Sequence, residues 1–243
     1  MITADDLEWT DLAVRGWGVY QRRRGYRFSI DAVLLAHFPR LSPGLDVCDT
    51  CTGSGVVAHL MTARQSGMHT LGLDIQPQMI AAAGAGRARN GIALETLDFA
   101  CRDLRAADCV PPGCFDLVTA NPPYYRPGAG AESPVEEVAL ARHERTLSLD
   151  ELCRFAARSL RHRGRFALIH LAARLDDVLA SCRAHRLKPA RLAPVYAREG
   201  EAAQLVLVEC VNGGRDSLTV EEPFYIYDNA GRYRPTVAAW YED

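Results

Sequence analysis

The chain has 243 residues, of which 48% are hydrophobic and 24% are charged, and its formal net charge is −2 at pH 7. These values are ordinary for a water-soluble globular protein and allow one large domain with a substantial core. No run of about 18 consecutive apolar residues is present, so the sequence excludes a membrane-spanning helix. The acidic N-terminus has no basic region followed by an apolar stretch, so we expect no secretory signal and a cytoplasmic location.

The eight cysteines include one C-x-x-C pair, Cys48 and Cys51. No second cysteine pair or histidine pair completes a zinc set, and Cys48 falls inside an apolar strand pattern. Small buried side chains are therefore the favoured interpretation, and no metal site is expected.

The small net charge gives no overall reason to expect nucleic acid, but two clusters of arginine stand out. They consist of Arg22, Arg23, Arg24 and Arg27, and of Arg158, Arg161, Arg163 and Arg165. Either cluster can neutralise phosphates, although a charge run is more often a solvated face.

From about residue 30 onward, strand patterns alternate with helical patterns. A helix over 28–38 is followed by an apolar strand over 45–50, a glycine-rich turn and a helix over 56–64. A strand over 69–75 and a helix over 76–91, which Asn90-Gly91 ends, come next. Two strand-plus-loop units over 94–103 and 115–124 precede an amphipathic helix over 147–164 with Ser148 as its N-cap.

The remaining sequence predicts a buried strand over 165–171, a helix over 172–185, and strands at 191–196 and 204–211. A last pattern over 224–233 predicts a hairpin with its turn at 228–231. Strands alternating with helices at this spacing indicate a doubly wound, mostly parallel α/β sheet, which binds ligands at the carboxyl ends of its strands. We expect one domain over 1–243, with an N-terminal arm and helix over 1–40 and the core over 41–243.

Three strand ends carry residues suited to a nucleotide-like ligand. The strand over 45–50 runs into Asp49-Thr50-Cys51-Thr52-Gly53-Ser54-Gly55, where glycines let a ligand approach the backbone. The next strand ends at Asp74, placed to accept hydrogen bonds from ribose hydroxyls, and a third ends at Asp103, placed to meet the amine of an adenine. Gly53-x-Gly55-x-x-Ala58 followed by Asp74 also fits the dinucleotide fingerprint. On these residues alone, a nicotinamide dinucleotide and S-adenosylmethionine are equally compatible, with a structural turn close behind.

Asn121-Pro122-Pro123-Tyr124, at the end of the fourth strand, separates these alternatives. The two prolines fix an extended turn. The Asn121 side-chain oxygen and the Pro122 carbonyl can then accept two hydrogen bonds from one planar NH2 group during attack on a sulfonium methyl. Tyr124 can stack on the ring that bears the amine, and Tyr125 can line the same pocket. Asn-Pro also starts ordinary turns, but this order of residues after a glycine loop and two strand-end acids favours a functional role.

The NPPY motif resembles that of the class I N6-adenine and glutamine methyltransferases. Over nearly the whole chain, the sequence is similar to the bacterial tRNA(Val) adenine-37 N6-methyltransferase family. The segments that carry this resemblance are FSIDAVLLA (28–36), DxxTGSG (49–55), NPPYY (121–125), ARHE (141–144), GRFALIH (164–170) and EAAQLVLVE (201–209). The resemblance implies a Rossmann-like fold with a seven-stranded sheet and an antiparallel C-terminal hairpin. It also implies S-adenosylmethionine as the cofactor and RNA, specifically tRNA, as the partner.

The same resemblance assigns residues to roles. In the cofactor site, Asp49, Gly53 and Gly55 would cradle the methionine part, with Cys51 beside them. Asp74 would hold the ribose, Asp103 would meet the adenine, and Phe28, Ser29 and Asp31 would close over the cofactor. The other cofactor-binding residues would be Ile75, Leu104 and Asn121. Catalysis would fall to Asn121, Pro122 and Tyr124, and substrate binding to Pro123, Tyr124, Tyr125, Arg142 and His143.

Two features qualify these assignments. The family usually has glycine where this chain has Cys51, so that side chain must point away from the cofactor or crowd it. Arg142, His143 and Glu144 would lie on the rim near the target base, and a salt-bridged loop end explains them equally well.

Four alternative functions stay open. A protein-glutamine methyltransferase shares NPPY but usually carries a longer N-terminal domain, and a guanine-N2 methyltransferase of ribosomal RNA shares the fold. A dinucleotide-dependent oxidoreductase would have no use for NPPY. A non-catalytic binder of S-adenosylmethionine or RNA would retain binding without turnover.

Overall fold

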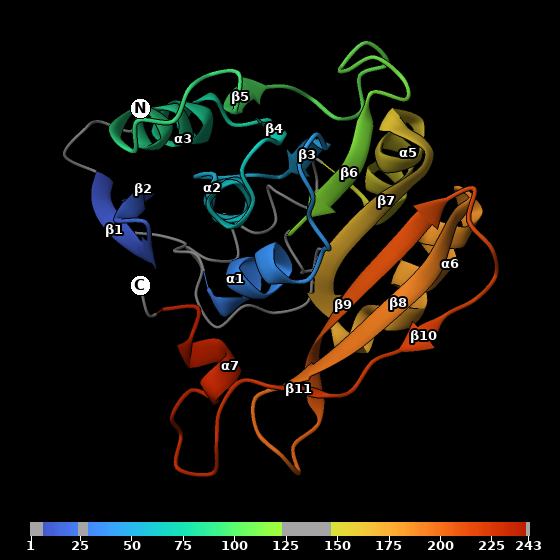
Figure 1. The fold of residues 1–243 in the computed structure, drawn as a ribbon. Helices are drawn as coiled ribbons and strands as arrows, with labels where there is room; N and C mark the ends of the chain where they lie inside the picture. The colour runs from blue at the N-terminus through green and yellow to red at the C-terminus, as the bar shows by residue number, and fades with distance from the viewer. Residues whose placement is uncertain (1–6, 24–28, 123–146, 242–243) are drawn as a thin grey trace, which may run out of the picture.

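A computed structural model describes residues 7–23, 29–122 and 147–241. Within these residues the main sheet has nine strands in the order β10-β8-β9-β7-β6-β3-β4-β5, with β11 paired to β8 (Figure 1). The long strands are β3 (Asp46–Thr50), β4 (His69–Asp74), β5 (Leu97–Cys101), β6 (Phe115–Ala120), β7 (Leu160–Leu171), β8 (Leu187–Tyr196) and β9 (Ala203–Asn212). The other two, β10 (Thr219–Val220) and β11 (Phe224–Tyr225), have two residues each.

Strands β5, β4, β3, β6 and β7 run parallel, whereas β9 is antiparallel to both β7 and β8. The mostly parallel sheet of seven long strands is therefore confirmed, and β9 supplies its antiparallel pairings. The two-residue strands extend it at the β8 edge, beyond the seven predicted.

Helices cover both faces of the sheet (Figure 1). One face carries α1 (Ile30–His37), α2 (Val56–Arg64) and α3 (Pro77–Arg89), and the other carries α5 (Leu149–Ser159) and α6 (Leu175–Ala184). Each face has its own apolar core: the first joins α1 and α2 to the sheet, and the second joins α5 and α6 to it. A short helix, α7 (Pro235–Ala238), lies near α1. None of the described helices is both long and apolar enough to cross a membrane.

The helix predicted over 147–164 begins as expected but ends early. Ser148 forms a capping box with Glu151, so the N-terminal prediction is confirmed. The helix stops at Ser159, and the chain continues directly as β7. The Asn212 side chain, from β9, donates hydrogen bonds to the carbonyls of Ala157 and Leu160. The cap thus comes from a distant strand, which a local periodicity cannot reveal.

An N-terminal hairpin, β1 (Leu7–Val14) paired antiparallel with β2 (Trp17–Arg22), was not predicted. Asn90, just beyond α3, accepts a hydrogen bond from the Gly18 amide and donates one to the Gly18 carbonyl. The Arg89 guanidinium lies 4.1 Å from the centre of the Trp9 ring. These contacts attach the hairpin to the end of α3, so what was expected to be an arm is part of the packed structure.

The hairpin predicted over 224–233 is largely replaced by another pairing. Its turn forms, since the Gly231 amide donates to the Asp228 carbonyl, and Tyr227 and Tyr233 make one antiparallel bridge. The first residues of the segment instead form β11, which runs parallel to β8. Pairing with the open edge of β8 therefore replaces pairing within the predicted hairpin.

Three arginines of the second cluster form contacts within the protein. Arg158 donates to the carbonyls of Ala106 and Ala107, and Arg161 pairs with Asp46 and Asp116. Arg165 pairs with Glu209. These contacts favour a structural role for the cluster. Of the first cluster, the Arg23 side chain donates to the Leu7 carbonyl, and Arg24 and Arg27 lie outside the described residues.

Candidate functional site

The glycine loop (residues 51–55) follows β3, and the asparagine–proline corner (Asn121-Pro122) follows the neighbouring strand β6. Both begin at the same height along the sheet. In the parallel pair of β3 and β6, Thr50 lies opposite Ala120, the residue before Asn121. On its other side, Thr50 lies opposite Leu73, the residue before Asp74. The strand-end residues predicted to bind one ligand are thus brought together along a single edge of the sheet. Asn121 and Pro122 are both partly exposed there.

Three residues of the glycine loop adopt the left-handed backbone conformation. The φ angles are +53° at Cys51, +54° at Gly53 and +82° at Gly55. This region disfavours residues with a Cβ atom. Glycine would adopt the conformation at position 51 with less strain than Cys51 does. The Cys51 side chain packs against the second core, and burial raises the pKa of its thiol. The side chain is therefore partly buried on the α5 face of the sheet.

Phe99, on β5, fills the space beneath the loop. A Cβ atom added to Gly55 would lie 2.6 Å from the Phe99 ring, and one added to Gly72 would lie closer still to the same ring. The ring stacks on buried His59 of α2, with 5.5 Å between ring centres. Because a carbonyl can only accept, the His59 Nδ1 atom donates to the Gly55 carbonyl at 2.7 Å. Burial lowers the pKa of His59 to about 4, so the ring is neutral.

This support of the loop was missed at the sequence level. The glycine at position 72 inside a strand pattern was the available signal, because glycine there indicates a close approach by a neighbouring group.

Asp49 is 1% exposed and braces the loop from within. Its two carboxylate oxygens accept hydrogen bonds from Thr52 at 2.6 Å and from Thr119 at 2.7 Å. Burial raises the pKa of Asp49 to about 6, against the lowering effect of those two hydroxyls. Thr119 was not among the predicted residues. Asp49 therefore joins the loop to β6 through its own side chain.

Asp74 connects the loop to the start of α3. One carboxylate oxygen accepts the Gly53 amide and the other accepts the Gln76 amide, each at 2.9 Å. Each oxygen has a further lone pair to offer to a hydroxyl group. The adjacent Ile75 is 39% exposed, which is unusual for a large apolar side chain and suits a flat ligand placed against it.

Asp103 forms an ion pair with Arg105. The Nη2 atom of Arg105 lies 2.7 Å from one carboxylate oxygen of Asp103, and Nε contacts both. This interaction holds the pKa of Asp103 below its usual value. Leu104, between them, is buried. An adenine amine that donates a hydrogen bond to Asp103 must therefore bind a carboxylate that Arg105 also contacts.

Of the remaining predicted residues, some lie within the described segments and the others lie outside them. Ser29 is the N-cap of α1, with no side-chain capping bond, and Asp31 lies in the first turn of that helix. The predictions for Phe28, Pro123, Tyr124, Tyr125, Arg142 and His143, and for Glu144 on the rim, fall outside the described residues.

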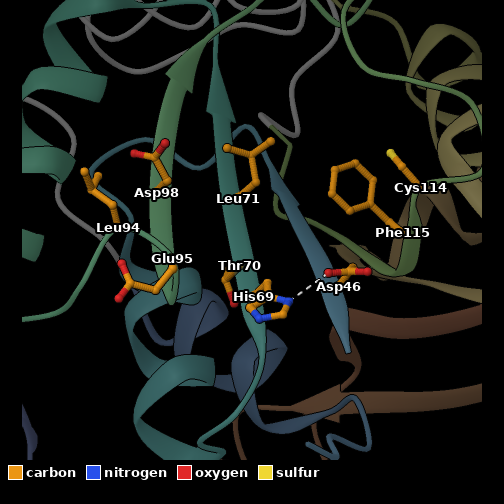
Figure 2. Close-up of a pocket in the computed structure, with 9 residues that line it drawn as sticks. All are labelled: Asp46, His69, Thr70, Leu71, Leu94, Glu95, Asp98, Cys114 and Phe115. Atoms are coloured by element: carbon orange, nitrogen blue, oxygen red, sulfur yellow. Dashed lines mark hydrogen bonds and ion pairs between the residues drawn. The ribbon is translucent and has the colours of Figure 1, made fainter. Parts of the chain in front are cut away.

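A depression of about 320 Å³ lies at the opposite, amino edge of the sheet. Figure 2 shows its lining at the starts of β3, β4 and β6, with Asp46 bonded to His69. It contains none of the predicted site residues. Parallel sheets bind at their carboxyl ends, so we assign the candidate site to the edge that carries the glycine loop. Among the described residues, no group of three or more His, Cys, Asp or Glu side chains is arranged to hold a metal ion.

Comparison with known proteins identifies several relatives. The family model described as "Methyltransferase domain" matches residues 41–202. A tRNA1(Val) (adenine(37)-N6)-methyltransferase from Porphyromonas gingivalis is 26% identical, over 86% of this chain and 84% of that protein. A protein of the same name from Aeromonas salmonicida is 28% identical, over 76% and 77%. A third, from Dickeya chrysanthemi, is 30% identical over 65% and 62%.

Solved structures agree with the fold. A predicted O-methyltransferase from Agrobacterium tumefaciens superposes with a TM-score of 0.71 at 20% identity, over 87% of this chain and 95% of that one. The [4+2]-cyclase SpnF superposes with a TM-score of 0.57 at 16% identity, over 78% and 83%. Because SpnF is a cyclase, the likeness supports the architecture and says nothing of the chemistry, which the site must decide.

Proposed function

The chain belongs to the methyltransferase domain family, and we propose that it transfers a methyl group from S-adenosylmethionine to the exocyclic N6 of an adenine in tRNA. The observation that carries this proposal is the register that sets Asn121 beside the glycine loop. The relatives named as tRNA adenine-N6 methyltransferases supply the substrate class. The proposal places the enzyme in the cytoplasm together with its tRNA substrate.

The residues present fit this cofactor. The left-handed Gly53 leaves the surface of the loop without a side chain, and a Cβ atom added there would meet only the end of Met79 at 3.7 Å. Asp74 has lone pairs to offer to ribose hydroxyls, and exposed Ile75 offers a flat apolar contact. When bound, S-adenosylmethionine supplies an electrophilic methyl group on a sulfonium sulfur.

Positioning accounts for most of the acceleration that these residues provide. The Asn121 side-chain oxygen and the Pro122 carbonyl accept hydrogen bonds from the two N–H groups of the target amine, which aligns the nitrogen lone pair with the methyl group. After methylation the nitrogen loses one of these two protons to solvent. Pro122 restricts the backbone at this point, so the two acceptors keep a fixed separation. No side chain forms a covalent bond in this scheme. A base presented to the corner must leave its stack, as enzymes that modify bases generally require.

The test is methylation of a tRNA transcript by the purified protein, followed by mass spectrometry of the nucleosides. We expect N6-methyladenosine with the wild type and at least about a 100-fold lower rate with Asn121→Ala, because one of two aligned acceptors is removed. Calorimetric titration with S-adenosylmethionine should give nearly the same affinity for both proteins. Full activity of Asn121→Ala, or methylation at a guanine or a protein glutamine instead, would contradict the proposal. A titration with NADH serves as the control for an oxidoreductase.

A further inference from the structure

The C-terminal segment contributes an aromatic surface that the proposed chemistry does not use. Tyr227, Tyr233 and Tyr241 form what we term the tyrosine stack. The ring of Tyr233 lies 5.2 Å from that of Tyr227 and 5.4 Å from that of Tyr241, with interplanar angles of 13° and 10°. Tyr233 is 41% exposed. The stack therefore presents flat apolar surface to solvent.

Arginine side chains surround the tyrosine stack. The Arg198 guanidinium lies 5.7 Å from the centre of the Tyr227 ring, and that of Arg234 lies 5.3 Å from the centre of the Tyr225 ring. Arg232 has 80% of its side chain exposed. Guanidinium groups over aromatic rings bind phosphate and also stack on bases.

Each of these arginines has a carboxylate neighbour. Arg198 pairs with Glu201, Arg232 with Asp228 and Arg234 with Glu199, at 2.9–3.4 Å. At least a third of each arginine side chain is exposed. Exposed ion pairs are weak in water, so a phosphate can replace the carboxylate at small cost. The surface is nearly neutral, and ring stacking must therefore provide much of its affinity for any ligand.

The surface is held rigidly to the fold. The Trp240 ring stacks on His37 of α1 at 4.1 Å and on Phe224 of β11 at 5.5 Å. Trp240 and Tyr241 also pack against the first core. A binding surface that is already ordered loses little conformational entropy when it takes a ligand.

The surface lies on the same edge of the sheet as Asn121. Tyr225 is opposite Tyr196 at the carboxyl end of β8. Because β8 and β7 are each antiparallel to β9, they run in the same direction as β6, and their carboxyl ends share an edge with it. Four strand steps separate β6 from β11, or about 19 Å at about 4.8 Å a step. Figure 1 shows β11 and α7 beside α1 along this edge.

We propose that the tyrosine stack, with Arg198, Arg232 and Arg234, binds the unpaired nucleotides that flank the target base in the RNA substrate. This inference rests on the proposed function and names the surface that holds its substrate. Unpaired bases stack on aromatic rings and guanidinium planes with little dependence on sequence, while arginines bind the backbone between them. Protein partners are disfavoured because this surface has the mixed aromatic and arginine character of a single-strand contact and faces the same side as the methyl-transfer corner.

The experiment measures binding of a fluorescein-labelled RNA hairpin that has an unpaired adenine in its loop, by anisotropy and without methyl donor. Tyr233→Ala should weaken binding about 10-fold, within the range known for one stacked base. Tyr233→Phe should bind as the wild type, because the ring is retained. The loss in Tyr233→Ala should be nearly the same at low and moderate salt, whereas the loss in Arg232→Ala should shrink as salt rises.

Two controls match these variants. Arg183→Ala removes an exposed arginine from the end of α6, at the amino edge, and Leu94→Ala trims an exposed apolar side chain at that edge. Both should bind RNA as the wild type. In the methylation assay, Tyr233→Ala should raise KM for the RNA about 10-fold while kcat at saturating RNA and the affinity for S-adenosylmethionine stay unchanged.

The inference is overturned if Tyr233→Ala binds the hairpin as tightly as the wild type. It is also overturned if light scattering shows that Tyr233→Ala and Arg232→Ala convert a dimer to a monomer, because the surface is then an interface between copies. Failure of the proposed function looks different: the wild type would bind the hairpin through the tyrosine stack and yet form no N6-methyladenosine.

Discussion

Substituting Gly72 by alanine tests whether Phe99 supports the glycine loop. A Cβ atom at position 72 would overlap the Phe99 ring and lie 2.9 Å from the Thr52 hydroxyl. The ring has little room to move, because Gly55 lies against it and His59 stacks on it. The new methyl group must therefore push the ring toward the loop or distort β4.

The expected cost follows from overpacking a filled site. Adding a methyl group where neighbours cannot move costs about 1–3 kcal/mol, so we expect Gly72→Ala to lower the free energy of unfolding by about 2 kcal/mol. In a chain of this size, that is a fall of about 4–8 °C in Tm. Because the displaced ring presses on Gly55, the affinity for S-adenosylmethionine should also fall.

Urea unfolding and calorimetric titration measure the two effects. Gly84→Ala is the matched control, since Gly84 lies within α3 with no atom within 4 Å of an added Cβ, and alanine there should stabilise by up to about 1 kcal/mol. Adding Phe99→Leu to Gly72→Ala should recover about 1 kcal/mol of the loss, because the ring is the obstacle. If Gly72→Ala is as stable as the wild type and binds the cofactor as tightly, Phe99 does not support the loop.

Two further predictions concern titratable groups. The pKa of His59 is about 4 in the folded protein and 6.5 in the unfolded chain, so between these pH values only the unfolded chain binds the proton. The stability that neutral His59 contributes is therefore complete above pH 6.5. It falls by about 3 kcal/mol as the pH drops to 4. Urea unfolding at pH 4–8 should show this slope reduced in His59→Phe, and an unchanged slope would contradict the burial of this ring. Arg105→Ala removes the ion-pair partner of Asp103 and should tighten binding of S-adenosylmethionine several-fold by calorimetry. Weaker binding would show instead that Arg105 is needed to orient the carboxylate.

The sequence was sufficient to predict the elements that position the site, but not the contacts that support it. Alternating patterns and strand-end acids located β3, β4 and β6 because parallel strands are continuous apolar runs that end in polar residues. The N-terminal hairpin was missed because its stability depends on Asn90, which lies 72 residues from Gly18. The true end of α5 was missed for the same reason, since Asn212 supplies its cap.

The strand-end acids also show why one sequence pattern can have several physical meanings. Both carboxylate oxygens of Asp49 accept hydrogen bonds inside the protein, from Thr52 and Thr119. The oxygens of Asp74 instead accept one hydrogen bond from the loop and one from the start of α3. The Gly53 amide is bonded to Asp74, and the Gly55 amide is bonded to the Thr52 carbonyl.

Neither glycine amide is therefore directed at a ligand. Gly53 has a left-handed backbone and leaves open space where a side chain would stand, whereas the corresponding space at Gly55 is filled by Phe99. Because Asp74 holds Gly53 directly, a hydroxyl group that binds this carboxylate would also act on the loop. In the proposed complex, the ribose end and the methionine end of the donor would thus be coupled through a single side chain, and we expect substitution of Asp74 to disturb both.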